Sequence, residues 1–164
     1  MLSVIGFVVA SAAGMAVACG KHPLGGWLFV FSGPFDALDG ALARTAGLET
    51  RFGAFLDSCL DRFSEAAVLF GLLYWCSYHD HPVLVLLCFV TMFGSVMVSY
   101  TRARAEGLAI SCRIGIFTRM ERFVVMALML VTGQLAVGLI LLACLTNFTA
   151  IQRIVHVYRQ SSAR

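Results

Sequence analysis

Long runs without a charged residue are the feature that most constrains how this chain can fold. Three such runs cover residues 1–20, 82–101 and 123–152. A helix needs about 20 apolar residues to cross the hydrocarbon core of a bilayer, which is roughly 30 Å thick. Each run meets that length, and residues 24–35 and 66–79 form two further apolar stretches. The runs therefore predict an integral membrane protein built from helices.

The composition supports this prediction. Of the 164 residues, 60% are apolar and 13% are charged, whereas an ordinary globular domain carries about 25% charged residues. The net charge of +3 is scattered through apolar sequence, so a nucleic-acid partner is not expected. The cysteines lack paired metal-ligand spacing, and we interpret them as small buried hydrophobic residues. They are Cys19, Cys59, Cys76, Cys88, Cys112 and Cys144.

The number of spans follows from the last apolar run and from the positions of the basic residues. The run is too long for one span, but a helix over residues 116–132, a turn at Gly133-Gln134 and a helix over 135–158 would form a hairpin. This gives six transmembrane helices. With both termini in the cytoplasm, every arginine lies on the cytoplasmic side and only Lys21 lies outside. This agrees with the enrichment of basic residues at the cytoplasmic ends of membrane spans. We expect one all-α membrane domain over residues 1–164, in the inner (cytoplasmic) membrane of the cell.

Four aspartates interrupt segments that otherwise predict transmembrane helix. They are Asp36, Asp39, Asp57 and Asp61. A carboxylate at the centre of a membrane helix costs about 3 kcal/mol on insertion scales, so a functional site is the first hypothesis. The spacings i,i+3 and i,i+4 place each pair on one helix face. Four hard oxygen donors favour Mg²⁺ or Mn²⁺, and two ions suit a phosphoryl displacement. A proton-coupled or sodium-coupled transporter is the alternative from a different class.

The residues between these aspartates carry a resemblance. The segment reads Asp36-x2-Asp39-Gly40-x2-Ala43-Arg44-x8-Gly53-x3-Asp57-x3-Asp61. It resembles the complete signature of the CDP-alcohol phosphotransferase family. The resemblance implies a six-helix membrane enzyme, expected to be a homodimer, that transfers a phosphate-bearing group from a CDP-linked donor to an alcohol and releases CMP.

The resemblance also implies a role for each residue of the signature. Asp36, Asp39 and Asp57 would bind the metal ions, and Asp61 would both contact the second ion and act as the general base. The cytidine and its phosphates would be framed by Asp39, Gly40, Ala43, Arg44 and Gly53. The donor would be CDP-diacylglycerol, bound at the cytoplasmic face.

Further basic clusters suggest the acceptor. The segments Ser99–Glu106, Glu121-Arg122 and Gln152-Arg153 resemble those of the phosphatidylinositol-phosphate synthases within the family. By that resemblance Arg102, Arg122 and Arg153 would bind the phosphate of inositol phosphate. Glycerol 3-phosphate also carries a phosphomonoester, so phosphatidylglycerophosphate synthesis is the close alternative.

Three smaller expectations complete the sequence prediction. Relatives begin with an interfacial helix, and we expect that segment to be missing before Met1. The pattern Ala10-Ser11-Ala12 is similar to a signal-peptidase site, but no basic residue precedes it, so a membrane span is preferred. We interpret the motif His79-Asp80-His81 as a solvated external turn rather than a metal site.

Overall fold

A computed structural model of the protein describes residues 2–33 and 50–162. These ranges contain six helices and no strand. Besides the helical residues 22–33, the helices are α1 (Leu2–Ala18), α3 (Arg51–Tyr78), α4 (Pro82–Gly107), α5 (Arg119–Thr132) and α6 (Leu135–Ser162). The predicted all-α fold is confirmed for the described part of the chain.

Local signals in the sequence set several helix boundaries. Pro82 begins α4, where its missing N–H costs no hydrogen bond. The predicted turn at Gly133-Gln134 is present, because Gly133 adopts a left-handed conformation (φ 74°) that ends α5. Helix α5 begins at Arg119, later than predicted, since the Thr118 N–H donates to the Glu121 carboxylate and fixes the first turn (2.8 Å).

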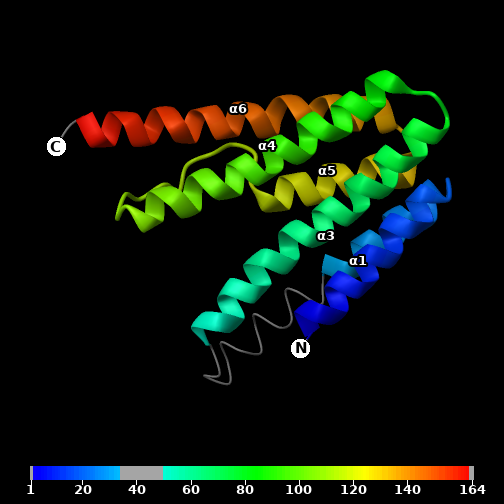
Figure 1. The fold of residues 1–164 in the computed structure, drawn as a ribbon, viewed down its shortest axis with the longest axis horizontal. Helices are drawn as coiled ribbons and strands as arrows, with labels where there is room; N and C mark the ends of the chain where they lie inside the picture. Colours follow the sequence, from blue (N-terminus) through cyan, green and yellow to red (C-terminus); the bar gives the residue numbers. More distant parts are fainter. Residues whose placement is uncertain (1, 34–49, 163–164) are drawn as a thin grey trace.

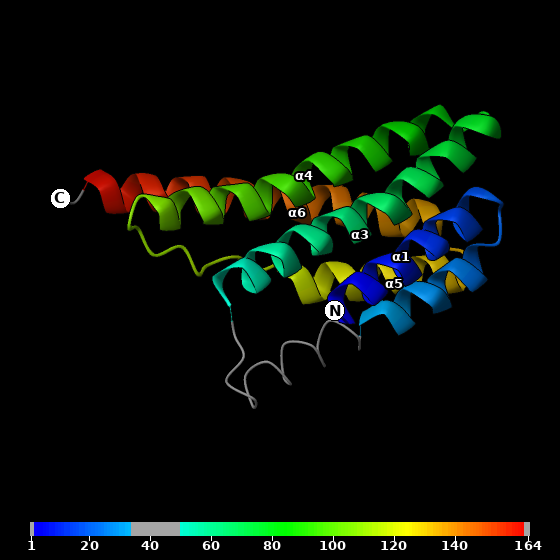
Figure 2. The same ribbon diagram turned by 60° about the horizontal axis from the view of Figure 1, so that its bottom comes forward.

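The helices pack in pairs along the bundle. Helix α4 lies side by side with α6, and α1 with α3, while α3 and α4 are joined by a tight turn (Figures 1 and 2). Helix α5 contacts α6. Residues 22–33 pack between α1 and α5, because a Cβ added to Gly25 would meet α1 and one added to Gly26 would meet α5. Helices from distant parts of the chain thus form one core.

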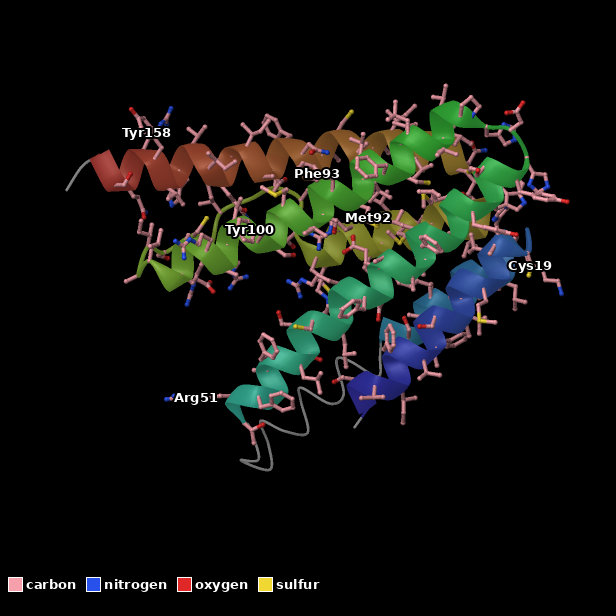
Figure 3. The ribbon with its side chains drawn as sticks, viewed as in Figure 1. Cys19, Arg51, Met92, Phe93, Tyr100 and Tyr158 are labelled. Carbon is pink, nitrogen blue, oxygen red and sulfur yellow. The ribbon has the colours of Figure 1, made fainter. Side chains whose placement is uncertain are left out.

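The two ends of the bundle differ in charge. Figure 3 shows Cys19 at one end and Arg51 and Tyr158 at the other. Lys21 comes two residues after Cys19, in the turn that connects α1 to the helical residues 22–33. The motif His79–His81 forms the exposed turn between α3 and α4 at the same end. The loop between α4 and α5, which carries Arg113, lies at the opposite end. This distribution agrees with the predicted separation of Lys21 from the arginines.

Large apolar side chains cover the outside of the molecule. On α4 alone, the exposed ones are Val83, Leu86, Phe89, Phe93, Val96 and Tyr100. Their spacing of three or four residues makes a continuous stripe, which water would not tolerate but lipid would. Among the described helices, α4 and α6 are long and apolar enough to cross a bilayer by length and composition, and α1 is apolar but shorter. The number of spans stays a prediction.

The cysteines follow the prediction only in part. Cys76, Cys88 and Cys112 are buried, as expected for small hydrophobic residues. Cys19 and Cys144 are exposed, so that interpretation is wrong for them. Cys19 directly follows the last residue of α1, and Cys144 lies on an exposed face of α6.

Two glycines allow α1 and α3 to touch through their backbones. A Cβ added to Gly71 would clash with the carbonyl of Gly14, and a Cβ added to Gly14 would clash with the carbonyl of Ala67. Small residues permit this approach, which is common between membrane helices. The contact positions the first half of α3 beside the start of α1.

We expect Gly71→Ala to push α1 away from α3 and to lower the free energy of unfolding by about 1–3 kcal/mol, the usual range for overpacking. Thermal unfolding in detergent would measure the change. Gly107→Ala is the matched control, because nothing lies within 4 Å of a Cβ added there. Equal stability of the two variants would contradict the close packing.

Candidate active site

The first half of α3 presents three carboxylates on one helix face. Asp57, Asp61 and Glu65 follow one another at intervals of four residues, which places them one above the next. The helix begins where it does because the Thr50 hydroxyl accepts a hydrogen bond from the Gly53 N–H (2.9 Å). The sequence predicted Asp57 and Asp61 as site residues but missed Glu65.

Asp61 is held between two arginines. Its side chain is 8% exposed, and one carboxylate oxygen pairs with Arg62 (Nη1 to Oδ2, 3.2 Å) while the other pairs with Arg119 of α5. Arg62 is fixed in turn, because its Nε donates to the Ser99 hydroxyl of α4 (3.1 Å). Asp61 is thus a nearly buried carboxylate with two arginine partners.

Asp57 receives a hydrogen bond from the first helix. The Ser3 hydroxyl donates to its Oδ1 at 3.0 Å, and Ser3 is itself buried. A hydrogen bond of this kind fixes the orientation of a carboxylate that binds a metal ion. Ser3 was not predicted as a site residue, and its short, weakly polar side chain within an apolar run gives little signal of such a role.

Glu65 forms an ion pair with Arg122 of α5. The Arg122 Nε lies 3.0 Å from Oε1 and Nη2 lies 3.4 Å from Oε2. The Arg122 side chain is 3% exposed, although it is one of the three arginines predicted to bind the acceptor phosphate. The regular spacing after Asp57 and Asp61 was the sequence signal that could have identified Glu65.

A small cavity lined by both polar and apolar side chains adjoins these ion pairs. Its volume is about 30 Å³, enough for about two water molecules. It lies between residues 22–33, α3 and α5. Its polar lining residues are Ser32, Asp61, Arg62, Ser64, Glu65, Arg119 and Arg122.

Each of the three predicted acceptor arginines has a partner within the protein, and Arg122 pairs with Glu65 as described above. Arg153 is buried and donates to two main-chain carbonyls, those of Val98 and of Ile114 (2.9 Å for the second). Arg102 is exposed and pairs with Glu106 in its own helix (2.9 Å).

Part of the predicted site falls outside the described residues. These positions are Asp36, Asp39, Gly40, Ala43 and Arg44. Within the described ranges, no group of three or more His, Cys, Asp or Glu residues could hold a metal ion. Asp57 and Asp61 are adjacent oxygen donors on one face of α3, a donor set that fits half of a magnesium or manganese site.

The family of this chain follows from its similarity to known proteins. The sequence matches the CDP-alcohol phosphatidyltransferase family over residues 1–155. The chain belongs to this family. It is therefore a transferase of phosphate-containing groups in phospholipid biosynthesis and a membrane protein, and the predicted family is confirmed.

Two relatives with assigned names are similar to this chain over most of its length. An archaetidylinositol phosphate synthase of Methanothermobacter thermautotrophicus is 37% identical over 165 residues, covering 97% of this chain and 82% of the relative. A phosphatidylinositol phosphate synthase of Mycobacterium tuberculosis is 38% identical over 154 residues, covering 84% of this chain and 66% of the relative.

Solved structures of the mycobacterial synthase share the fold. The crystal structure with CDP-DAG bound has a TM-score of 0.90 and 33% identity, covering 96% of this chain and 84% of that one. The crystal structure with manganese and citrate has a TM-score of 0.89 and 34% identity, covering 96% of this chain and 80% of that one. A divalent metal in a relative agrees with the carboxylate donors of α3 in this chain.

We expect Ser3→Ala to weaken Mn²⁺ binding by about tenfold, because Asp57 loses the hydrogen bond that orients it. Titration of the purified protein with Mn²⁺, followed by electron paramagnetic resonance, would measure the affinity without any turnover. Ser11→Ala is the matched control, since the Ser11 hydroxyl donates only to the Phe7 carbonyl of its own helix (2.8 Å). Equal Mn²⁺ affinities in the two variants would contradict the role of Ser3.

Proposed function

We propose that this protein transfers a phosphatidyl group from CDP-diacylglycerol to inositol phosphate, giving phosphatidylinositol phosphate and CMP. One observation carries the proposal. The two similar synthases are named for different lipids, archaetidyl and phosphatidyl, yet both are named for inositol phosphate. The mycobacterial relative is seen with CDP-DAG bound, which supports a diacylglycerol donor here.

The predicted chemistry is consistent with the surroundings of Asp61. The acceptor hydroxyl attacks the phosphorus that carries diacylglycerol, a new P–O bond forms, the pyrophosphate bond breaks, and CMP leaves. Asp61 would take the hydroxyl proton as general base. Its ion pairs with Arg62 and Arg119 fix the position of the carboxylate beside the small cavity.

Metal ions would be held by Asp36, Asp39, Asp57 and Asp61, as the signature implies. Two Mg²⁺ or Mn²⁺ ions would neutralise charge on the pyrophosphate and on the attacking oxygen. Of these four residues, Asp57 and Asp61 lie within the described part of the chain, about one helical turn apart on α3. The hydroxyl of Ser3 would fix the orientation of Asp57.

The donor nucleotide would bind near the start of α3. The signature assigns this role to Asp39, Gly40, Ala43, Arg44 and Gly53. Gly53 lies in the exposed first turn of α3, where the absent side chain leaves its backbone accessible.

The acceptor phosphate would bind to Arg102, Arg122 and Arg153. Several guanidinium groups in one place suit a phosphomonoester dianion. Arg122 and Arg153 are buried and held by Glu65 and by main-chain carbonyls, so their positions are set before the substrate arrives. Such prior ordering reduces the entropy that binding must overcome.

We also propose the membrane arrangement that the charge distribution indicates. The chain would cross the inner membrane six times with both termini in the cytoplasm and the active site at the cytoplasmic face. The α4–α5 loop, which carries Arg113, and the start of α3, with Arg51, lie at one end of the bundle. Cys19, two residues before Lys21 in the chain, lies at the other end (Figure 3). A homodimer is expected from the family resemblance.

The purified protein should release CMP from CDP-diacylglycerol when inositol phosphate and Mg²⁺ or Mn²⁺ are present. Detection of CMP and of the lipid product by mass spectrometry would test this. Chelation of the metal should abolish release. Release with glycerol 3-phosphate but not with inositol phosphate would favour phosphatidylglycerophosphate synthesis, and no release with either would contradict the proposed acceptor.

Replacing the proposed base should stop chemistry without stopping donor binding. We expect Asp61→Asn to lower kcat by about 10²–10⁴-fold, the usual contribution of a general base. The variant keeps the size of the side chain, and equilibrium binding of CDP-diacylglycerol would show whether the donor site is intact. Turnover close to that of the unchanged protein would remove Asp61 from this role.

A further inference from the structure

We infer that Glu65 is a positioning residue for the acceptor, because it holds the guanidinium of Arg122 in place inside the bundle. Neither the signature nor the resemblance assigns Glu65 a role. The inference rests on the proposed function in one respect, namely that Arg122 binds the acceptor phosphate.

The geometry of the ion pair fixes more than a distance. Two different nitrogens of Arg122, Nε and Nη2, face two different oxygens of Glu65, at 3.0 and 3.4 Å. A two-point contact sets the plane of the guanidinium as well as its position. The donors of Arg122 that Glu65 does not occupy therefore have a defined direction.

Burial makes this contact necessary. The side chains of Arg122 and Glu65 are only 3% and 14% exposed. A buried cation whose partner is removed remains uncompensated, so it moves or draws water inward. Glu65 thus keeps Arg122 in the bundle while no substrate is bound.

The contact also places Arg122 next to the proposed base. Arg119 and Arg122 lie three residues apart on α5, and they pair with Asp61 and Glu65, which lie four residues apart on α3. The same two helices are therefore joined by two ion pairs about one turn apart. The cavity of about 30 Å³ is lined by members of both pairs. Arg122, oriented beside this cavity, can hold a phosphate at a fixed distance from the Asp61 carboxylate.

A second ion pair in the molecule offers a contrast. Arg102 and Glu106 are both about half exposed and belong to the same helix (Nε to Oε1, 2.9 Å). Water can replace either partner, so this pair contributes little to orientation. Loss of Glu106 removes a carboxylate from a proposed acceptor arginine without freeing a buried one, which makes it a matched control for Glu65.

The test is a double-mutant cycle in which the KM values of the variants are compared. The variants are Glu65→Ala, Glu65→Gln, Arg122→Ala, the double variant Glu65→Ala/Arg122→Ala, and Glu106→Gln. For each, the KM for inositol phosphate, the KM for CDP-diacylglycerol and kcat would be measured in the same detergent. Thermal unfolding would show that each variant folds.

We expect Glu65→Ala to raise the KM for inositol phosphate at least tenfold and to change the KM for CDP-diacylglycerol less than twofold. Glu65→Gln should recover part of the loss, because its amide oxygen still accepts one hydrogen bond from Arg122. The double variant should be no more than twofold worse than Arg122→Ala, since Glu65 acts through Arg122. Glu106→Gln should change the acceptor KM less than twofold.

Four results would overturn the inference while leaving the proposed function intact. They are an unchanged acceptor KM in Glu65→Ala and Glu65→Gln, equal rises in the two substrate KM values, additive losses in the double variant, and an equal rise in Glu106→Gln. If Glu65→Ala does not fold, Glu65→Gln alone decides by the same KM comparison. Absence of turnover by the unchanged protein with either phosphorylated alcohol would refute the proposed function, and the inference with it.

Discussion

Ion pairing between α3 and α5 is the interaction on which the site depends. Carboxylates are costly inside an apolar helical bundle unless a cation or water compensates them. Asp61 meets this requirement with Arg119 of α5, and Glu65 meets it with Arg122. The same pairs connect α5 to α3 at two points about one turn apart, so the charges that the chemistry requires also link the two helices.

The apolar half of the molecule supports this arrangement from the opposite end. Beyond Glu65, α3 continues into buried Val68, Leu69 and Leu72, which belong to the hydrophobic core. Gly14 and Gly71 let α1 lie directly against that part of α3. Since α1 and α3 run in the same direction, this contact also places Ser3 beside Asp57. Tight packing far from the charges thus determines a hydrogen bond within the site.

Much of the fold followed from local patterns. The charge-free runs predicted helices, Gly133 predicted the turn before α6, and the spacing of Asp57 and Asp61 placed both on one face of α3. The partners of side chains were predicted less well where they lie far away in the sequence. Arg153 was predicted only as a phosphate ligand, yet it donates to the main chain of α4 and of the α4–α5 loop. Nothing local in the sequence distinguishes these partners.

The sequence by itself determined the chemistry available to this protein. The eight-position signature and the placement of arginines are linear features, and they identified the family, the carboxylates and the basic residues before any helix was placed. Only the tertiary structure decided which arginine meets which carboxylate. Arg122 and Glu65 are 57 residues apart in the chain, and their contact depends on how α3 and α5 pack. That packing is set by the whole apolar core, so no local pattern in the sequence contains it.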